Sequence, residues 1–162
     1  MIPEVELDLQ VALDDKADHY IPEQEKLIEW VSEALVKAGF DKHNASVSLR
    51  VVSEDEIKDL NRQYRNMAKP TNVLSFPYDE LPDVDVNLLG DIVVCSAIME
   101  KEASEQMKTL EQHWAHIIIH GVLHLLGYDH LEEDQAEKME SLEIDILSKL
   151  GIPNPYGELN TP

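Results

Sequence analysis

Residues 109–127, TLEQHWAHIIIHGVLHLLG, carry the clearest helix signal in the chain. Thr109 and Gln112 form a capping-box pattern at the start of this stretch, and Gly127 is the usual left-handed stop at its end. Between them lie four histidines at i, i+3, i+7 and i+11, which share one helix face: His113, His116, His120 and His124. A single histidine at one of these positions would indicate only a solvent-exposed polar face of the helix. Four on one face, with His130 just beyond the helix end, favour a metal site.

Spacing decides which of these histidines can share an ion. Residues four apart on a helix are separated by about 6 Å along its axis, so two such imidazoles can converge on one tetrahedral zinc. Both His116 with His120 and His120 with His124 meet this condition. A turn at Gly127 brings His130 back beside His124 rather than His116. We therefore expect His120, His124 and His130 to bind one zinc ion per chain.

Two further residues flank the predicted ligands. His116 is expected to be either a structural neighbour or a partner of a ligand ring. Asp129 is either an acceptor for a ligand ring's second N–H or simply a turn residue. Three neutral imidazoles leave one coordination position open, which is typical of catalytic zinc, whereas structural zinc is usually closed by four ligands. Cys95, the only cysteine, follows a strand-like run and is expected to be buried and inert.

The spacing H-x-x-x-H-x-x-G-x-x-H matches the zinc-binding helix of the metzincin peptidases. In those enzymes a glutamate directly after the first histidine is the general base. Here that position is Gly121, which cannot transfer a proton. The coordination frame is therefore present while the peptidase base is absent.

The rest of the chain predicts one α+β domain over residues 1–162, with a metzincin-like zinc-binding helix, a small mixed sheet of about four strands and about five helices. Alternating or β-branched runs predict strands at 5–13, 46–53, 71–77 and 90–96. Besides the histidine helix, we expect helices between Pro22 and Gly39, from Ser53 to about Tyr64, from a Ser96 cap to about Met107, and over about 131–150. Residues 77–90 are expected to form a loop, and 152–162 an irregular tail.

Charge limits the possible partners. Acids outnumber bases 33 to 13, for a formal net charge of -20, which argues against a broad phosphate-binding surface. Five of the 13 bases nevertheless lie within residues 50–69: Arg50, Lys58, Arg62, Arg65 and Lys69. Together these bases predict either a local cationic cleft able to hold one or two phosphates or a solvated helix face, which we expect for Lys58 and Arg62. No secretory signal or membrane-spanning run is recognisable, so we expect a cytoplasmic protein without membrane association.

Three stretches together resemble the bacterial YbeY family of rRNA maturation factors and single-strand-specific endoribonucleases. They are HGVLHLLGYDH at 120–130, LNRQYRNMAKPTNVLSFP at 60–77 and LLGDIVVC at 88–95. Length and element order agree as well. The resemblance implies that His120, His124 and His130 are the zinc ligands and that Arg65 is functionally important. Asn66 departs from a frequent glycine, and Asn72 departs from a frequent aspartate.

The expected function is a zinc-dependent endoribonuclease that cleaves single-stranded RNA. The resemblance implies a role in 16S rRNA 3′-end maturation and ribosome quality control, with the small ribosomal subunit and its proteins as partners and no DNA. Arg65 is the expected catalytic and phosphate-binding residue, and Asn72 and Ser75 are further substrate-binding candidates. One alternative is a non-enzymatic ribosome-assembly factor with a structural metal, whose acidic last helix contacts basic ribosomal proteins. The other is a zinc hydrolase of another substrate class, against which Gly121 counts.

Overall fold

The computed structural model describes residues 2–14, 19–78, 87–129 and 132–156. These residues form four strands and five helices in the order that the sequence predicts. The strands are β1 (Glu4–Val11), β2 (Asn44–Val52), β3 (Val73–Pro77) and β4 (Leu88–Cys95). The helices are α1 (Gln24–Lys37), α2 (Glu54–Arg65), α3 (Ser96–Glu105), α4 (Leu110–Leu125) and α5 (Glu133–Lys149). The predicted α+β class is confirmed.

The strands form one mixed sheet in the order β1-β2-β4-β3. β1 and β2 are parallel and in register from Glu4 opposite Asn44, and β2 is also parallel to β4. β3 runs antiparallel to β4 at the edge, with Val73 opposite Val94. β3 is short and forms one edge of the sheet. Its side chains therefore lie beside the end of the layer of helices and not over the middle of the sheet.

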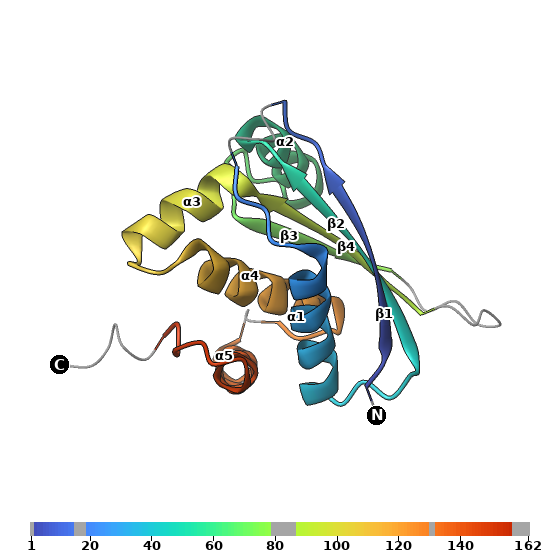
Figure 1. The fold of residues 1–162 in the computed structure, drawn as a ribbon. Coiled ribbons are helices and arrows are strands. Elements are labelled where there is room, and N and C mark those ends of the chain that lie inside the picture. The colour runs from blue at the N-terminus through green and yellow to red at the C-terminus, as the bar shows by residue number, and fades with distance from the viewer. Residues whose placement is uncertain (1, 15–18, 79–86, 130–131, 157–162) are drawn as a thin grey trace.

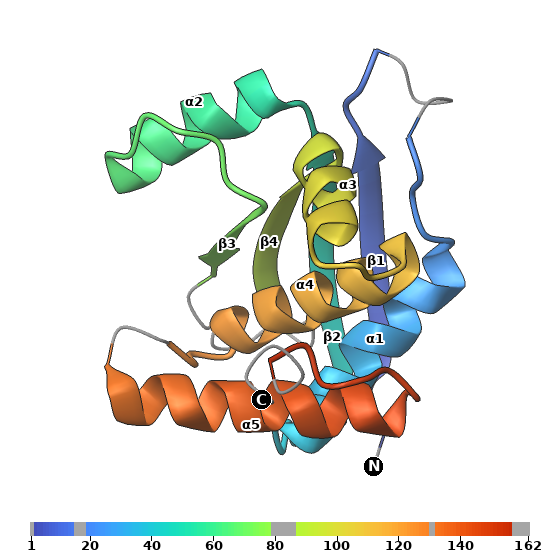
Figure 2. The ribbon, with the colours of Figure 1, turned by 90° about the vertical axis from the view of Figure 1, so that its left-hand side faces the viewer.

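The two faces of the sheet are covered by different helices. Figures 1 and 2 show α1, α4 and α5 on one side of the sheet. Residues of β4 alternate between the faces: Ile92 and Val94 join the main core under α1 and α4, whereas Val93 and Cys95 join a smaller cluster with Ile57 of α2. Cys95 is fully buried, and burial raises the pKa of its thiol, as expected for an inert cysteine.

Helix α4 has the predicted ends. The Thr109 hydroxyl accepts a hydrogen bond from the Gln112 N–H at 3.1 Å, and Gly127 adopts the left-handed conformation with φ of 100°. Between these ends the helix is buried on most sides, because the sheet, α1 and α5 all pack against it. Apolar side chains fill these contacts: Trp114, Ile118, Ile119, Val122 and Leu123.

Some predicted boundaries are wrong. Cys95 rather than Ser96 is the cap residue of α3, and Ser96 is the first helical residue, with its hydroxyl 3.2 Å from His19 Nδ1. β4 begins at Leu88, inside the predicted 77–90 loop, because its first residues pair with β2. Residues 152–156 form the described part of the predicted tail, and 157–162 lie outside the described residues, as does the predicted start of the last helix at Leu131. Within the described ranges, no helix is long and apolar enough to cross a membrane.

Gly90 is required by the close approach of β3 and β4. Its φ is 148°, and a Cβ there would collide with the Phe76 carbonyl oxygen and lie 2.9 Å from Pro77 Cα. We predict that Gly90→Ala lowers the free energy of unfolding by about 2 kcal/mol or more in urea denaturation. Gly39→Ala is the control, because Gly39 also has positive φ but a Cβ there would have no atom within 4 Å. Its expected loss is about 1 kcal/mol. Equal losses in the two variants would contradict the steric account.

Candidate active site

A cleft of about 710 Å³ opens where α2, β3 and the end of α4 meet. The last turn of α2 contributes Tyr64 and Arg65, β3 and the two residues before it form one wall, and α4 contributes His120 and His124. The turn after α4 closes the cleft with Gly127, Tyr128 and Asp129. Two predicted ligands, the predicted catalytic arginine and the substrate-binding candidates Asn72 and Ser75 thus line one cavity.

His120 and His124 present ring nitrogens to each other. Their Nε2 atoms are 3.1 Å apart, and the ring centroids are 4.6 Å apart at 77°. Two imidazoles bound to one tetrahedral zinc at about 2.0–2.1 Å have their nitrogens about 3.3 Å apart. The pair therefore fits a shared zinc ion. Within the described residues no group of three His, Cys, Asp or Glu is arranged to hold a metal. The third predicted ligand, His130, lies outside those residues.

Glu143 of α5 lies behind these histidines. Its carboxylate is buried and 3.3 Å from His120 Nδ1, on the opposite side of the ring from Nε2. It also lies 2.9 Å from His116 Nε2 and accepts a 2.9 Å hydrogen bond from the Tyr156 hydroxyl. His116 is thus connected to a predicted ligand through a shared carboxylate. His116 therefore lies beside the site and takes part in its hydrogen bonding through Glu143.

Burial and hydrogen bonding oppose each other at Glu143. Burial alone would raise the pKa of the Glu143 carboxyl, but hydrogen bonds from His116 and His120 outweigh it and lower the pKa to about 2. Burial lowers the pKa of His116, which favours its neutral form. Burial and the neighbouring Glu143 charge both raise the pKa of Tyr156. A carboxylate surrounded by neutral donors is therefore the state that these contacts favour.

Sequence reasoning missed Glu143 and Tyr156. A signal for Glu143 was present, since it falls between Met139 and Ile146 on the apolar face of the last helix, where an acid is out of place. Its partners could not be read without knowing that α5 packs against α4. Tyr156 stands in a segment that was expected to be an irregular tail, so nothing in its local pattern indicated a contact.

Asn72 and Ser75 have structural partners as well as a place in the cleft wall. Asn72 Nδ2 donates to Glu102 Oε1 at 3.0 Å, and that same oxygen lies 2.9 Å from His113 Nε2. His113, the fourth histidine of the stripe, therefore faces α3 rather than the predicted zinc ligands. The Ser75 hydroxyl donates to the Gly121 carbonyl at 3.3 Å and ties β3 to α4.

The predicted cationic cluster does not gather in this cleft. Arg50 lies in β2 and binds Glu56 at 2.7 Å, and Arg62 pairs with Asp59 at 3.2 Å. Of the three arginines, Arg65 lines the cleft, and its side chain is exposed. Among the described residues, Arg65 is therefore the one arginine or lysine that lines the cleft with His120 and His124. Asp129 is half-buried at the rim of the same cleft.

A mixed sheet covered by a histidine-bearing helix, with a cleft at that helix's C-terminal end, defines an α+β protein with the layout of a small single-domain enzyme. Similarities to known proteins agree with this class. A family model described as endoribonuclease YbeY matches residues 11–151. An endoribonuclease YbeY of Cellvibrio japonicus (strain Ueda107) is 47% identical over 157 residues, covering 97% of this chain and 86% of that protein. The solution structure of TM1509 from Thermotoga maritima aligns with a TM-score of 0.54 at 34% identity, over 91% of both chains.

The chain therefore belongs to the endoribonuclease YbeY family, and the expected resemblance is confirmed. Family membership makes it a nuclease, which is a hydrolase.

Gly121 has a packing role in addition to lacking a base. A Cβ at this position would lie 3.2 Å from Ile92 Cδ1 and 3.4 Å from the Ser75 hydroxyl. The position therefore faces β3 and β4. We predict that Gly121→Glu, which restores the metzincin glutamate, lowers the free energy of unfolding by about 3 kcal/mol or more and creates no peptidase activity.

Thermal melting and a peptide-cleavage assay check this prediction. Gln112→Glu adds the same charge to the half-buried first turn of α4 and should melt close to the wild type. A stably folded Gly121→Glu protein that cleaves peptides would contradict the packing account.

Proposed function

We propose that this protein is a zinc-dependent endoribonuclease that cleaves single-stranded RNA in 16S rRNA 3′-end maturation and ribosome quality control. The observation that carries the proposal is the shared cleft, in which the facing Nε2 atoms of His120 and His124 lie together with the exposed Arg65. Family membership supplies the reaction class. One zinc ion per chain, held by His120, His124 and His130, is the proposed cofactor.

Each part of the cleft has a defined chemical task. Bound zinc would supply positive charge and Lewis acidity at the scissile phosphate. Arg65 presents a planar fork of N–H donors that suits two phosphate oxygens, and it stabilises the charge that develops on them. Asn72 and Ser75 form part of the cleft wall, and their hydrogen bonds to Glu102 and Gly121 keep that wall rigid.

An aromatic pair beside Arg65 supports a single-stranded substrate. Tyr64 is 65% exposed, and its ring meets Phe76 edge-on with centroids 5.1 Å apart. Both residues line the cleft. A base that stacks on an aromatic side chain gains about 1–3 kcal/mol, and only an unpaired base is free to do so. With Arg65 on the adjacent residue, a phosphate and its neighbouring base can be bound together.

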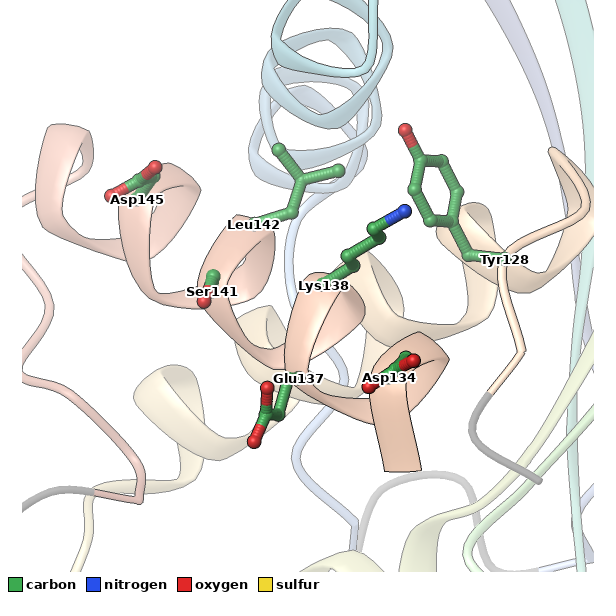
Figure 3. Close-up of a pocket in the computed structure, with 7 residues that line it drawn as sticks. All are labelled: Tyr128, Asp134, Glu137, Lys138, Ser141, Leu142 and Asp145. Carbon is green, nitrogen blue, oxygen red and sulfur yellow. The ribbon is translucent and has the colours of Figure 1, made fainter. Parts of the chain in front are cut away.

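The acidic exterior supports protein partners on the ribosome. A hollow of about 610 Å³ along α5 is lined by Asp134, Glu137 and Asp145, and Lys138 there is directed toward Tyr128 (Figure 3). Such a surface attracts basic protein segments and repels RNA. We propose proteins of the small ribosomal subunit as its partners and the cytoplasm as the compartment. This surface would equally serve a non-enzymatic assembly factor, so RNA cleavage is the deciding observation.

The proposal predicts different defects for the two sides of the cleft. Arg65→Ala should keep bound zinc and lose RNA cleavage by about 100-fold or more, because a donor to the developing charge is removed. His124→Ala should lose both zinc and cleavage. Zinc content by elemental analysis and cleavage of a labelled single-stranded oligonucleotide provide the two measurements.

Arg62→Ala is the matched control, because Arg62 lies one turn earlier on α2, is exposed and pairs with Asp59. It should cleave as the wild type does. Undiminished cleavage by both Arg65→Ala and His124→Ala would contradict the proposal, and so would a zinc-loaded wild type that cleaves peptide and not RNA.

The stacking role predicts a defect in binding rather than in metal content. Tyr64→Ala should weaken binding of a single-stranded oligoribonucleotide about tenfold, whereas Tyr64→Phe keeps the ring and should bind almost normally. Fluorescence anisotropy on metal-free protein measures this without cleavage. An equal loss of duplex RNA binding, or no loss with Tyr64→Ala, would contradict the stacking role.

A further inference from the structure

We infer that Glu143 is a positioning residue that selects the metal-binding tautomer of His120, and that Tyr156 of the C-terminal segment holds Glu143 in place. The inference rests on the proposed function for the identity of the metal. The contacts of Glu143 and the tautomer of His120 concern the protein without metal.

Three donors from two parts of the chain converge on one carboxylate. The Glu143 side chain is 1% exposed. Its Oε1 lies 2.9 Å from His116 Nε2 and 2.9 Å from the Tyr156 hydroxyl, and both of its oxygens lie 3.3 Å from His120 Nδ1. A buried carboxylate without such partners would be strongly destabilising. The Glu143 carboxylate can therefore be buried between α5 and α4 because these three groups hydrogen-bond to it.

The carboxylate dictates where the proton of His120 resides. An ionised carboxylate only accepts hydrogen bonds, so His120 Nδ1 must carry the proton that it donates. In the neutral ring, Nε2 then keeps its lone pair, and this is the atom that lies 3.1 Å from His124 Nε2. Glu143 thus orients the lone pair of His120 into the cleft before a metal arrives. The carboxylate also places a negative charge next to Nδ1, which makes the lone pair of Nε2 a stronger ligand for a cation.

Tyr156 joins the C-terminal segment to this arrangement. The Asn154 side chain accepts a 2.8 Å hydrogen bond from the Tyr156 N–H, which turns the chain after α5. The Tyr156 ring then packs edge-on against His116 with centroids 5.4 Å apart, and its hydroxyl reaches Glu143. Tyr156 and His116 together hold one carboxylate oxygen, so the carboxylate cannot rotate away from His120 without breaking both contacts.

The simpler alternative is that Glu143 serves only to satisfy His116 in the core. That alternative accounts for one contact at 2.9 Å and predicts no influence on the cleft. It leaves unexplained why both carboxylate oxygens are equidistant from His120 Nδ1.

Nuclear magnetic resonance of ¹⁵N-labelled, metal-free protein tests the tautomer directly. We expect His120 of the wild type to be protonated at Nδ1. In Glu143→Gln, of nearly the same size, the amide can donate to Nδ1 as well as accept, and we expect the Nε2-protonated form to become populated. Glu137→Gln is the matched control, because Glu137 is exposed on the same helix in the separate hollow along α5, and its loss should leave the tautomer unchanged. An Nε2-protonated His120 in the wild type would overturn the inference, and so would an unchanged tautomer in Glu143→Gln.

Zinc affinity, measured by competition with a chromophoric chelator, provides the second readout. We expect Glu143→Gln to bind zinc about 10- to 100-fold more weakly than the wild type, as for other partners of ligand histidines. Tyr156→Phe should keep the tautomer and bind zinc severalfold more weakly. Unchanged affinity in Tyr156→Phe would refute the role of the C-terminal segment.

The two readouts also separate this inference from the proposed function. A wild type that binds no zinc while its His120 is protonated at Nδ1 would contradict the proposed function and leave the positioning geometry intact.

Discussion

Helix α4 is buried on most sides and carries four imidazole rings. The elements that pack around this helix must therefore supply each ring with a hydrogen-bond partner. Buried polar groups without hydrogen bonds are costly, so each ring must meet a donor or an acceptor. His113 meets Glu102 of α3, and His116 and His120 both meet Glu143 of α5. His124 meets His120. These contacts connect α4 to α3 and to α5, and the Ser75 hydroxyl connects it to β3, while its last turn is left open to the cleft.

The position of this last turn explains why we propose that the reaction takes place there. β3 lies at the edge of the sheet, and the α2 end projects beside it, so the cleft is bounded by a strand, a helix end and a turn. Gly121 allows α4 to approach β3 closely, and the Ser75 hydroxyl bonds to its carbonyl. The same glycine that excludes a peptidase base therefore supports the wall on which a nucleic acid would lie. In a chain with a net charge of -20, the proposed metal would add positive charge beside the one arginine that lines this cleft.

Local sequence patterns predicted the elements well, and long-range packing explains where they failed. The Thr109 and Gln112 cap, the Gly127 stop and the face shared by His120 and His124 are local features and are confirmed. The predicted cationic cleft is wrong because Arg50 pairs with Glu56 and Arg62 with Asp59, and of the five bases Arg65 alone lines the cleft. The strand neighbours of Arg50, Leu49 and Val51, face the main core, so strand alternation turns Arg50 to the face covered by α2, where it lines a separate hollow with Glu56 and Tyr64. Glu143 and Tyr156 are joined to His120 only through the packing of α5 and the segment after it, which no local pattern contains.

Anomalous diffraction at the zinc absorption edge, from crystals of the zinc-loaded protein, tests the central claim most directly. We predict one peak per chain, about 2.0–2.1 Å from Nε2 of both His120 and His124 and within the cleft that holds Arg65. A zinc ion bound elsewhere, or coordination of His120 through Nδ1 with its contact to Glu143 broken, would contradict the account.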